Sequence, residues 1–160
     1  LDAGAHGDFD FVAAVNFNDV SVTRVPTSLS ALSPTPTLLG RNRILTIEQG
    51  TPGEKAVLSA DWTLDNWGAT VRASYYGDVL QPGASAAADF RTGEHTLFDF
   101  EGRYRFSETI SFALGVDNAF DEYPDAVPAA LNTSGVVAFP FYSPFGLNGR
   151  FAYARLSVGW

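Results

Sequence analysis

Apolar and polar residues alternate along six separate stretches of the sequence. The stretches span residues 8–23, 55–65, 68–78, 96–106, 109–118 and 150–160. In the fourth stretch, for example, Phe98 and Phe100 alternate with Asp99 and Glu101. A period of two residues is typical of strands whose two faces meet different surroundings. The pattern therefore predicts an all-β chain with about six long strands.

The connections between these stretches alternate between long and short. Residues 24–54, 79–95 and 119–149 form long loops, whereas tight turns are expected at Asn66-Trp67 and Ser107-Glu108. Membrane β-barrels sort their connections in this way, with short turns on the periplasmic side and long loops outside. We therefore predict an antiparallel up-and-down meander with all long loops at one end. The first stretch exceeds the ~10 residues that a membrane strand needs, so residues 19–23 are expected to rise above the bilayer.

Aromatic residues favour a lipid-facing assignment for the apolar face. They lie mostly near strand ends, where the interfacial girdles of membrane barrels occur, and comprise Trp62, Tyr75, Phe98, Tyr104, Phe106 and Trp160. Single-chain bacterial barrels have at least about eight strands. An open sheet in lipid would leave unpaired backbone groups at its edges. We therefore expect either further strands before residue 1 or several chains that share one barrel.

Composition and charge exclude several classes of function. The formal net charge of −8 and the lack of a basic patch argue against nucleic-acid binding. The chain has no cysteine, and its two histidines, His6 and His95, have no partner at metal-ligand spacing. No serine lies in a nucleophile elbow, and no catalytic triad or acid pair is visible. We therefore expect no metal, no cofactor and no enzymatic activity.

Two arginines in the first long loop are candidates for contact with an anionic ligand such as a chelate. Arg41 and Arg43 precede the alternating stretch 44–48. Ion pairs with Glu48 or Glu54 are the alternative role for both arginines. Patterns with a helical period are hard to find, and the alanine-rich stretch 84–88, which has no apolar face, is expected to be a loop.

The third long loop is rich in aromatic residues. Phe139, Phe141 and Tyr142, followed by Phe145, could stack on a ligand. The alternative is that they pack the loop against itself or over the mouth of the barrel.

Three segments resemble those of one family. The string GVDNAFDEYP at positions 115–124 resembles a segment near the end of TonB-dependent receptors. The string SPFGLNGR at positions 143–150, followed by a strand that ends on an aromatic residue, resembles their final loop and strand. Positions 51–70, TPGEKAVLSADWTLDNWGAT, resemble the family's strand with a tryptophan and a tight Trp-Gly turn.

The resemblance implies a segment of a large outer-membrane barrel of about 22 strands with a plugged lumen. The chain would supply the last six strands, without the N-terminal plug that contacts TonB. The family imports scarce ligands such as iron chelates, cobalamin or carbohydrates. The implied partners are outer-membrane lipid, the plug and remaining strands, TonB and the barrel-assembly machinery. Another outer-membrane barrel, either a porin or an enzyme, and a soluble sugar-binding β-domain are the alternatives.

The end of the sequence matches an assembly signal in this family. Leu156, Val158 and Trp160 occupy alternate apolar positions, with tryptophan in place of the commoner phenylalanine. The resemblance implies that the barrel-insertion machinery reads them. The alternative is a strand that merely ends in an aromatic residue.

Overall fold

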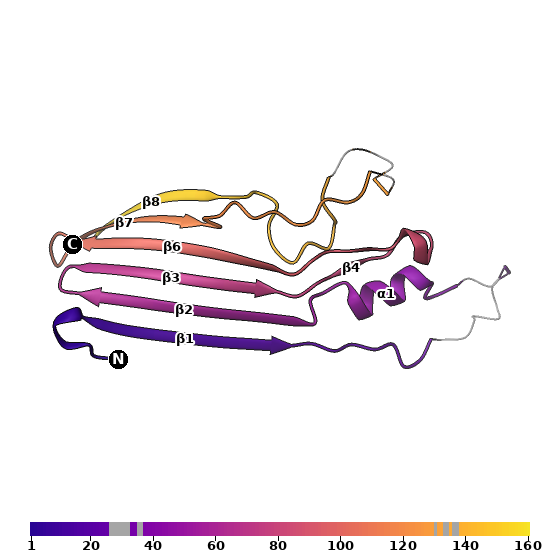
Figure 1. The fold of residues 1–160 in the computed structure, drawn as a ribbon, viewed down its shortest axis with the longest axis horizontal. Helices are drawn as coiled ribbons and strands as arrows, with labels where there is room; N and C mark the ends of the chain where they lie inside the picture. Colours follow the sequence, from indigo (N-terminus) through magenta and orange to yellow (C-terminus); the bar gives the residue numbers. More distant parts are fainter. Residues whose placement is uncertain (26–32, 35–36, 130, 133–134, 136–137) are drawn as a thin grey trace.

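A single antiparallel sheet dominates the computed structural model, which describes residues 1–25, 33–34, 37–129, 131–132, 135 and 138–160 (Figure 1). Its strands are β1 (Asp8–Phe17), β2 (Glu54–Leu64), β3 (Trp67–Tyr76), β6 (His95–Arg105), β7 (Ile110–Asp117) and β8 (Phe151–Val158). The strands pair in the order β1-β2-β3-β6-β7-β8. The predicted up-and-down meander of six long strands is therefore confirmed.

The long connections all leave the sheet at the same end. Figure 1 shows the connections after β1, β3 and β7 at one end of the strands, and the two tight turns at the other. This arrangement is the one that the alternating lengths predict. Parts of the predicted loops 24–54 and 119–149 lie outside the described residues.

The strand boundaries differ from the predicted ones at several points. β1 ends at Phe17, so residues 18–23 do not continue the strand as predicted. The β2–β3 turn consists of Asp65 and Asn66, because Leu64 pairs with Trp67. Asp65 has a φ of 52°, a left-handed conformation that a short side chain able to bond its own backbone tolerates. The prediction of Asn66-Trp67 was therefore wrong by one residue.

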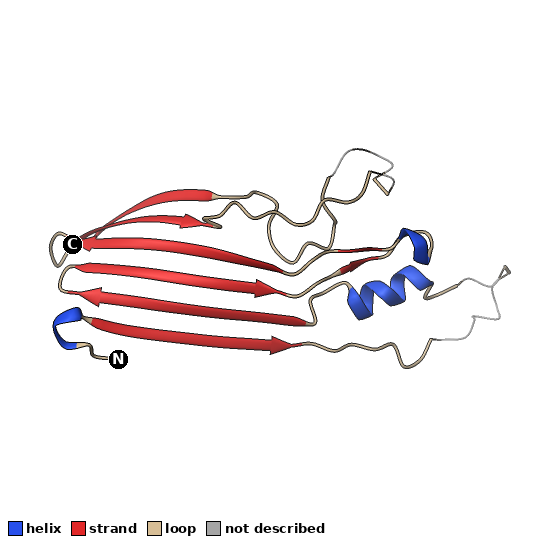
Figure 2. Cartoon of the chain, in the orientation of Figure 1, coloured by secondary structure: helices blue, strands red, loops and turns tan. Residues whose placement is uncertain are grey.

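The long loops contain regular structure that the alternation did not predict. Helix α1 (Arg41–Gln49) includes the alternating stretch 44–48 of the first long loop, and a short turn of 3-10 helix spans Ala86–Ala88 (Figure 2). Strands β4 (Leu80–Gln81) and β5 (Phe90–Arg91) form a small hairpin beside α1. The expectation of a loop throughout 84–88 was therefore wrong at Ala86–Ala88. A second short 3-10 helix, η1 (Gly4–His6), precedes β1.

The strand register separates polar from apolar side chains across the whole sheet. One row of paired residues runs through Asp61, Thr70 and Glu101, and the next through Ala60, Val71 and Phe100. Paired residues project to the same face, and successive residues of a strand project to opposite faces. We call the face that carries the first row the inner face and the face that carries the second row the outer face. A concavity of about 800 Å³ opens on the first.

Few side chains are buried within the described residues, as expected for one wall of a barrel. The apolar side chains of the outer face are largely exposed, including Phe11, Leu58, Val71, Leu114 and Leu156. The buried residues Val79, Leu80 and Thr92 lie instead where the β4–β5 hairpin begins and ends. Among the described helices, none is long and apolar enough to cross a membrane.

Candidate functional site

A chain of hydrogen bonds and ion pairs links four strands across the inner face. Arg103 of β6 donates to Asp61 Oδ1 of β2 at 2.8 Å and to Thr70 Oγ1 of β3 at 2.6 Å. On its other side, Arg103 Nη1 lies 3.6 Å from Glu101 Oε1. Arg155 of β8 then bonds both oxygens of Glu101, at 3.1 and 3.0 Å. Four alternating charges thus compensate one another along this wall, so their arginines are already occupied.

A second set of polar contacts lies one row nearer to the long loops. Arg72 Nε and Nη2 each lie 2.7 Å from Asp99 Oδ2. The other oxygen of Asp99 accepts from the backbone N–H of Asn118 at 2.8 Å, at the point where β7 ends. Asp99 therefore joins the wall to the start of the third long loop.

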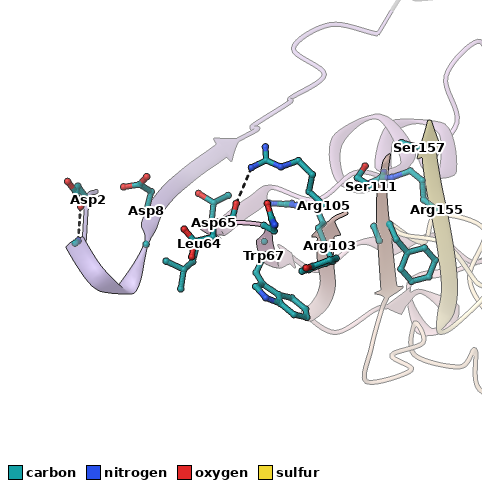
Figure 3. A pocket seen from close by; sticks show the side chains of 18 residues that line it. Asp2, Asp8, Leu64, Asp65, Trp67, Arg103, Arg105, Ser111, Arg155 and Ser157 are labelled. Atoms are coloured by element: carbon teal, nitrogen blue, oxygen red, sulfur yellow. Dashed lines mark hydrogen bonds between the residues drawn. The ribbon is translucent and has the colours of Figure 1, made fainter. Parts of the chain in front are cut away.

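The inner face is concave at the end of the tight turns. A cavity of about 800 Å³ is lined there by residues of the N-terminal segment and of both turns, including Asp2, Asp8, Arg103, Arg105 and Arg155 (Figure 3). Arg105 Nη2 donates to the carbonyl oxygen of Asp65 at 3.2 Å. The lining carries both signs of charge and is open, which suits a protein surface better than a small ligand.

Helix α1 is bound to the β4–β5 hairpin by polar contacts at both of its ends. Arg41 at its start forms an ion pair with Asp89, and Gln49 at its end accepts from Arg91. The hydrogen bond from Arg41 and a second from the Gly83 amide hold the pKa of Asp89 below its ordinary value. Both bonds act in this direction because they stabilise the carboxylate. These contacts fix the helix over the hairpin.

The two candidate arginines have different surroundings. Arg41 pairs with Asp89 and not with Glu48 or Glu54, so the proposed alternative partners were wrong. Glu48 instead accepts from the backbone N–H of Val22 at 2.9 Å. Arg43, two residues further along the helix, is exposed. Contact with a ligand remains a proposal for both.

The candidate aromatic residues are not gathered in one place. Phe139 stacks on Tyr123, with ring centroids 5.7 Å apart and an angle of 12° between the planes. Phe141 is 82% exposed, and its backbone N–H donates to Gln81 Oε1 of the hairpin. Tyr142 lines a cavity of about 330 Å³ beside Lys55. Phe139 thus packs the loop, whereas Phe141 and Tyr142 are available for contact.

The motif at 118–123 holds the third long loop together, a role that its sequence alone did not reveal. Asn118 bonds the backbone of Glu122 in both directions, at 2.7 and 2.8 Å. Asp121 accepts from the N–H of Arg150 at 2.8 Å and so binds the residue that precedes β8. The two ends of the loop are therefore tied directly to each other.

His95 lies on the inner face, and the spacing of residues in the sequence did not predict its partner. Its Nδ1 lies 2.7 Å from Glu122 Oε1, and its side chain is only 6% exposed. Its ring meets that of Phe145 edge-on, with centroids 5.2 Å apart. Glu122 lies 27 residues away in the sequence and follows β7, so the pairing of β6 with β7 helps to bring the two together. Within the described part of the chain, no three acidic or histidine side chains form a metal-binding group.

The candidate assembly signal lies at the edge of the sheet. Leu156 and Val158 project from the outer face of β8, in register with Phe112 and Ile110 of β7. Trp160 follows the end of the strand and is fully exposed. The reading of these residues by an assembly machinery stays a prediction.

Solved structures that resemble this chain include receptors for ferric enterobactin and for ferric catecholates. A mutant of the ferric enterobactin receptor of Pseudomonas aeruginosa is 17% identical over 99% of this chain and 20% of its own, with a TM-score of 0.61. Another mutant, in complex with enterobactin, is 22% identical over 68% of this chain and 16% of its own, with a TM-score of 0.53. The ferric-catecholate import receptor Fiu of E. coli K12 is 13% identical over 93% of this chain and 18% of its own, with a TM-score of 0.59.

At such identities, these likenesses establish the fold, and this chain spans about a fifth of the length of the first of these receptors. A search among curated proteins finds no match. The model of the family described as TonB dependent receptor-like, beta-barrel, matches residues 1–119. Since this match covers well over half of the 160 residues, the chain belongs to the TonB-dependent receptors of the bacterial outer membrane, as a segment of their β-barrel.

Proposed function

We propose that this chain forms part of the wall of a receptor that imports a ferric catecholate chelate across the outer membrane. The observation that carries the proposal is the match of the family's barrel model to residues 1–119. The similar structures are receptors for ferric enterobactin and for ferric catecholates. This similarity favours a ferric catecholate over cobalamin or a carbohydrate as the ligand. In this role the chain is a binding and transport element and not an enzyme.

The two faces and two ends of the sheet support different roles in such a receptor. The apolar outer face suits contact with lipid, and the ion-paired inner face suits contact with a plug. The long loops, with Arg43, Phe141 and Tyr142 on their surfaces, suit the first encounter with a ligand outside the cell. Leu156, Val158 and Trp160 would be recognised by the barrel-assembly machinery, and TonB would act through the plug.

Growth under iron limitation tests this proposal. A strain that lacks the receptor should lose growth on a ferric tris-catecholate as its only iron source, and the intact gene should restore it. Growth should also require TonB, because the proposed import consumes energy from the inner membrane. Unchanged growth on the catecholate, together with a defect on cobalamin or on a carbohydrate, would assign the receptor to one of those ligands instead.

A further inference from the structure

We propose that the cavity between Lys55 and Tyr142 is a subsite for an anionic aromatic group of the ligand. The cavity is about 330 Å³ and is lined by Thr51, Lys55, Tyr76, Tyr142, Ser143 and others. This volume lies within the range of about 300–1,000 Å³ that is typical of small-molecule sites. The inference rests on the proposed import function and names the part of the ligand that this wall would recognise.

The cavity opens on the inner face, at the end of the long loops. Lys55 pairs with Asn16 on one side and Tyr76 on the other, and Tyr76 pairs with His95. This row has the parity of Asp61, Thr70 and Glu101, so its side chains project into the barrel. A ligand that enters from outside would meet this row before it meets the ion-paired wall below.

Lys55 offers the positive charge. It is the only lysine in the sequence. Its Nζ stands over the ring of Tyr76, 4.7 Å from the centroid, and no ion pair among the described residues includes it. Arg72, Arg103 and Arg155, which share the inner face, all contact carboxylates. The charge of Lys55 is thus left for an anion, while Tyr76 holds the side chain in place by a cation–π contact.

The rest of the lining offers an aromatic ring and further donors. Tyr142 presents a ring and a hydroxyl. Thr51 Oγ1 accepts from Asn18 Nδ2 at 3.2 Å, which leaves its own hydrogen to donate. A phenolate or carboxylate on an aromatic ring would complement this lining, with its charge at Lys55 and its ring against Tyr142. An uncharged aliphatic chelate would use neither feature.

The roof of the cavity is anchored, so the site is largely formed before a ligand arrives. Phe145 packs on Tyr76, with centroids 5.6 Å apart, and on His95. Glu122 fixes the His95 ring through Nδ1, and Ser143 Oγ donates to the carbonyl oxygen of Phe145 at 2.6 Å. These contacts hold residues 142–144 above Lys55. Glu122, His95 and Phe145 are therefore positioning residues for the site.

Binding to the intact receptor in detergent tests the inference. The probes are ferric tris-catecholate and an uncharged ferric tris-hydroxamate. Binding of each probe is measured by the quenching of tryptophan fluorescence. We expect Lys55→Gln to weaken catecholate binding about tenfold, because it removes one charge-assisted contact. Tyr142→Leu should weaken it too, and Arg24→Gln, which removes an exposed charge outside the cavity, should leave it unchanged. Unaltered catecholate affinity in Lys55→Gln, or an equal loss for the hydroxamate, would overturn the inference.

A labelling experiment separates this inference from the proposed function. Amine-reactive labelling of the wild-type receptor, read by peptide mass spectrometry, reports on Lys55 directly, because a labelled peptide from these 160 residues can carry its side-chain label only there. Free 2,3-dihydroxybenzoate should protect Lys55, whereas an uncharged catechol ether should not. Protection in a receptor that imports no iron chelate would support the subsite and refute the import proposal. Absence of protection by the aryl carboxylate would refute the subsite whatever the receptor imports.

Discussion

At the scale of single residues, the start of β8 depends on a glycine and two side chains of the 118–123 motif. Gly149 has a φ of 64°, and a Cβ built on it would lie 2.2 Å from Tyr123 Oη and 2.6 Å from Asp121 Oδ1. Any larger residue would both strain the backbone and displace these two side chains. The carboxylate of Asp121 holds the next residue, Arg150, by its N–H. The position therefore requires glycine for two independent reasons.

We predict that Gly149→Ala lowers the yield of folded receptor. The left-handed backbone alone costs about 1–2 kcal/mol with a Cβ, and the close contacts add to this. Gly146→Ala is the matched control, because a Cβ there meets nothing within 4 Å. The measurement is the heat-modifiable gel mobility of the receptor in outer-membrane fractions. Equal yields for the two variants would show that the loop adapts to the extra methyl group.

A second residue-scale prediction concerns the contact of Asp89 with α1. The hydrogen bonds from Arg41 and Gly83 lower the pKa of Asp89 in the folded loop. A depressed carboxyl pKa stabilises the folded form above the unfolded value of about 3.9, and the stabilisation is lost as the pH falls through the folded pKa. We therefore expect residues 83–91 to exchange their amide hydrogens faster below about pH 4 than the intrinsic rate change explains.

Substitutions provide the comparison for this pH effect. Asp89→Asn should show the faster exchange already at neutral pH and should lose the additional response to acid. Asp19→Asn, at an exposed position, should behave like the wild type. An acid response that persists in Asp89→Asn would locate the titrating group elsewhere.

At the scale of elements, the sequence predicts the strands of the sheet because each strand has two different faces. Alternation at Phe98 to Glu101 is visible without any knowledge of neighbouring strands, and the register carries the two faces across all six strands. Helix α1 was not predicted, because its stretch 44–48 also alternates and its stability comes from Asp89 and Arg91, more than 40 residues away. The β4–β5 hairpin is too short to show a period.

The candidate site shows the same division between local and distant information. Arg43, Phe141 and Tyr142 were chosen by residue type, and the structure leaves their surfaces available. Lys55 was not chosen, because nothing in its local sequence shows that Tyr142 lines the same cavity. Only the folding of the third long loop over the inner face brings these two residues to one cavity.

We predict that the inner-face charges couple neighbouring strands, with Glu101 as their centre. Its carboxylate contacts Arg103, Arg155 and the hydroxyl of Tyr153, and is only 14% exposed. Glu101→Gln should lower the free energy of unfolding by about 1–2 kcal/mol, because it weakens charge-assisted bonds. The effect is no larger because the bonds to Arg155 are partly exposed to solvent. Glu108→Gln, in the exposed β6–β7 turn, is the control. Urea unfolding of the receptor in detergent is the measurement, and equal midpoints would make the network energetically neutral.

At the scale of the whole molecule, the sheet is open at both edges. Among the described residues, β1 and β8 each pair with one strand only, and beyond the single bridge of Asp8 to Asp2 their outer edges carry backbone groups without a strand partner. The outer face adds a broad apolar surface. Such edges recruit other strands. We therefore predict that these 160 residues, expressed alone, aggregate in water or need detergent. A stable monomer in detergent-free sedimentation would show that the segment folds as an independent domain.

The last prediction tests which face of the sheet meets lipid. Leu58 and Ser59 are neighbours near the centre of β2 and project to opposite faces, since Leu58 pairs with Ala73 and Ser59 with Arg72. A lysine on the lipid face near the middle of the membrane costs about 2–4 kcal/mol, whereas the lumen tolerates charge. Leu58→Lys should therefore reduce the folded receptor in the outer membrane strongly.

Ser59→Lys is the matched control, because it adds the same side chain to the adjacent position. Its ammonium would lie on the inner face in a cavity lined by Arg72, Asp99 and Asp117. Arg72 already pairs with Asp99, but the ion pairs of the described residues do not include Asp117, so this carboxylate can compensate the new charge. The folded yield of this variant should be close to that of the wild type in the same gel-mobility assay. A higher yield for Leu58→Lys than for Ser59→Lys would mean that the polar face meets lipid. The assignment of inner and outer faces would then be inverted, and the proposed ligand subsite, which depends on this assignment, would be wrong.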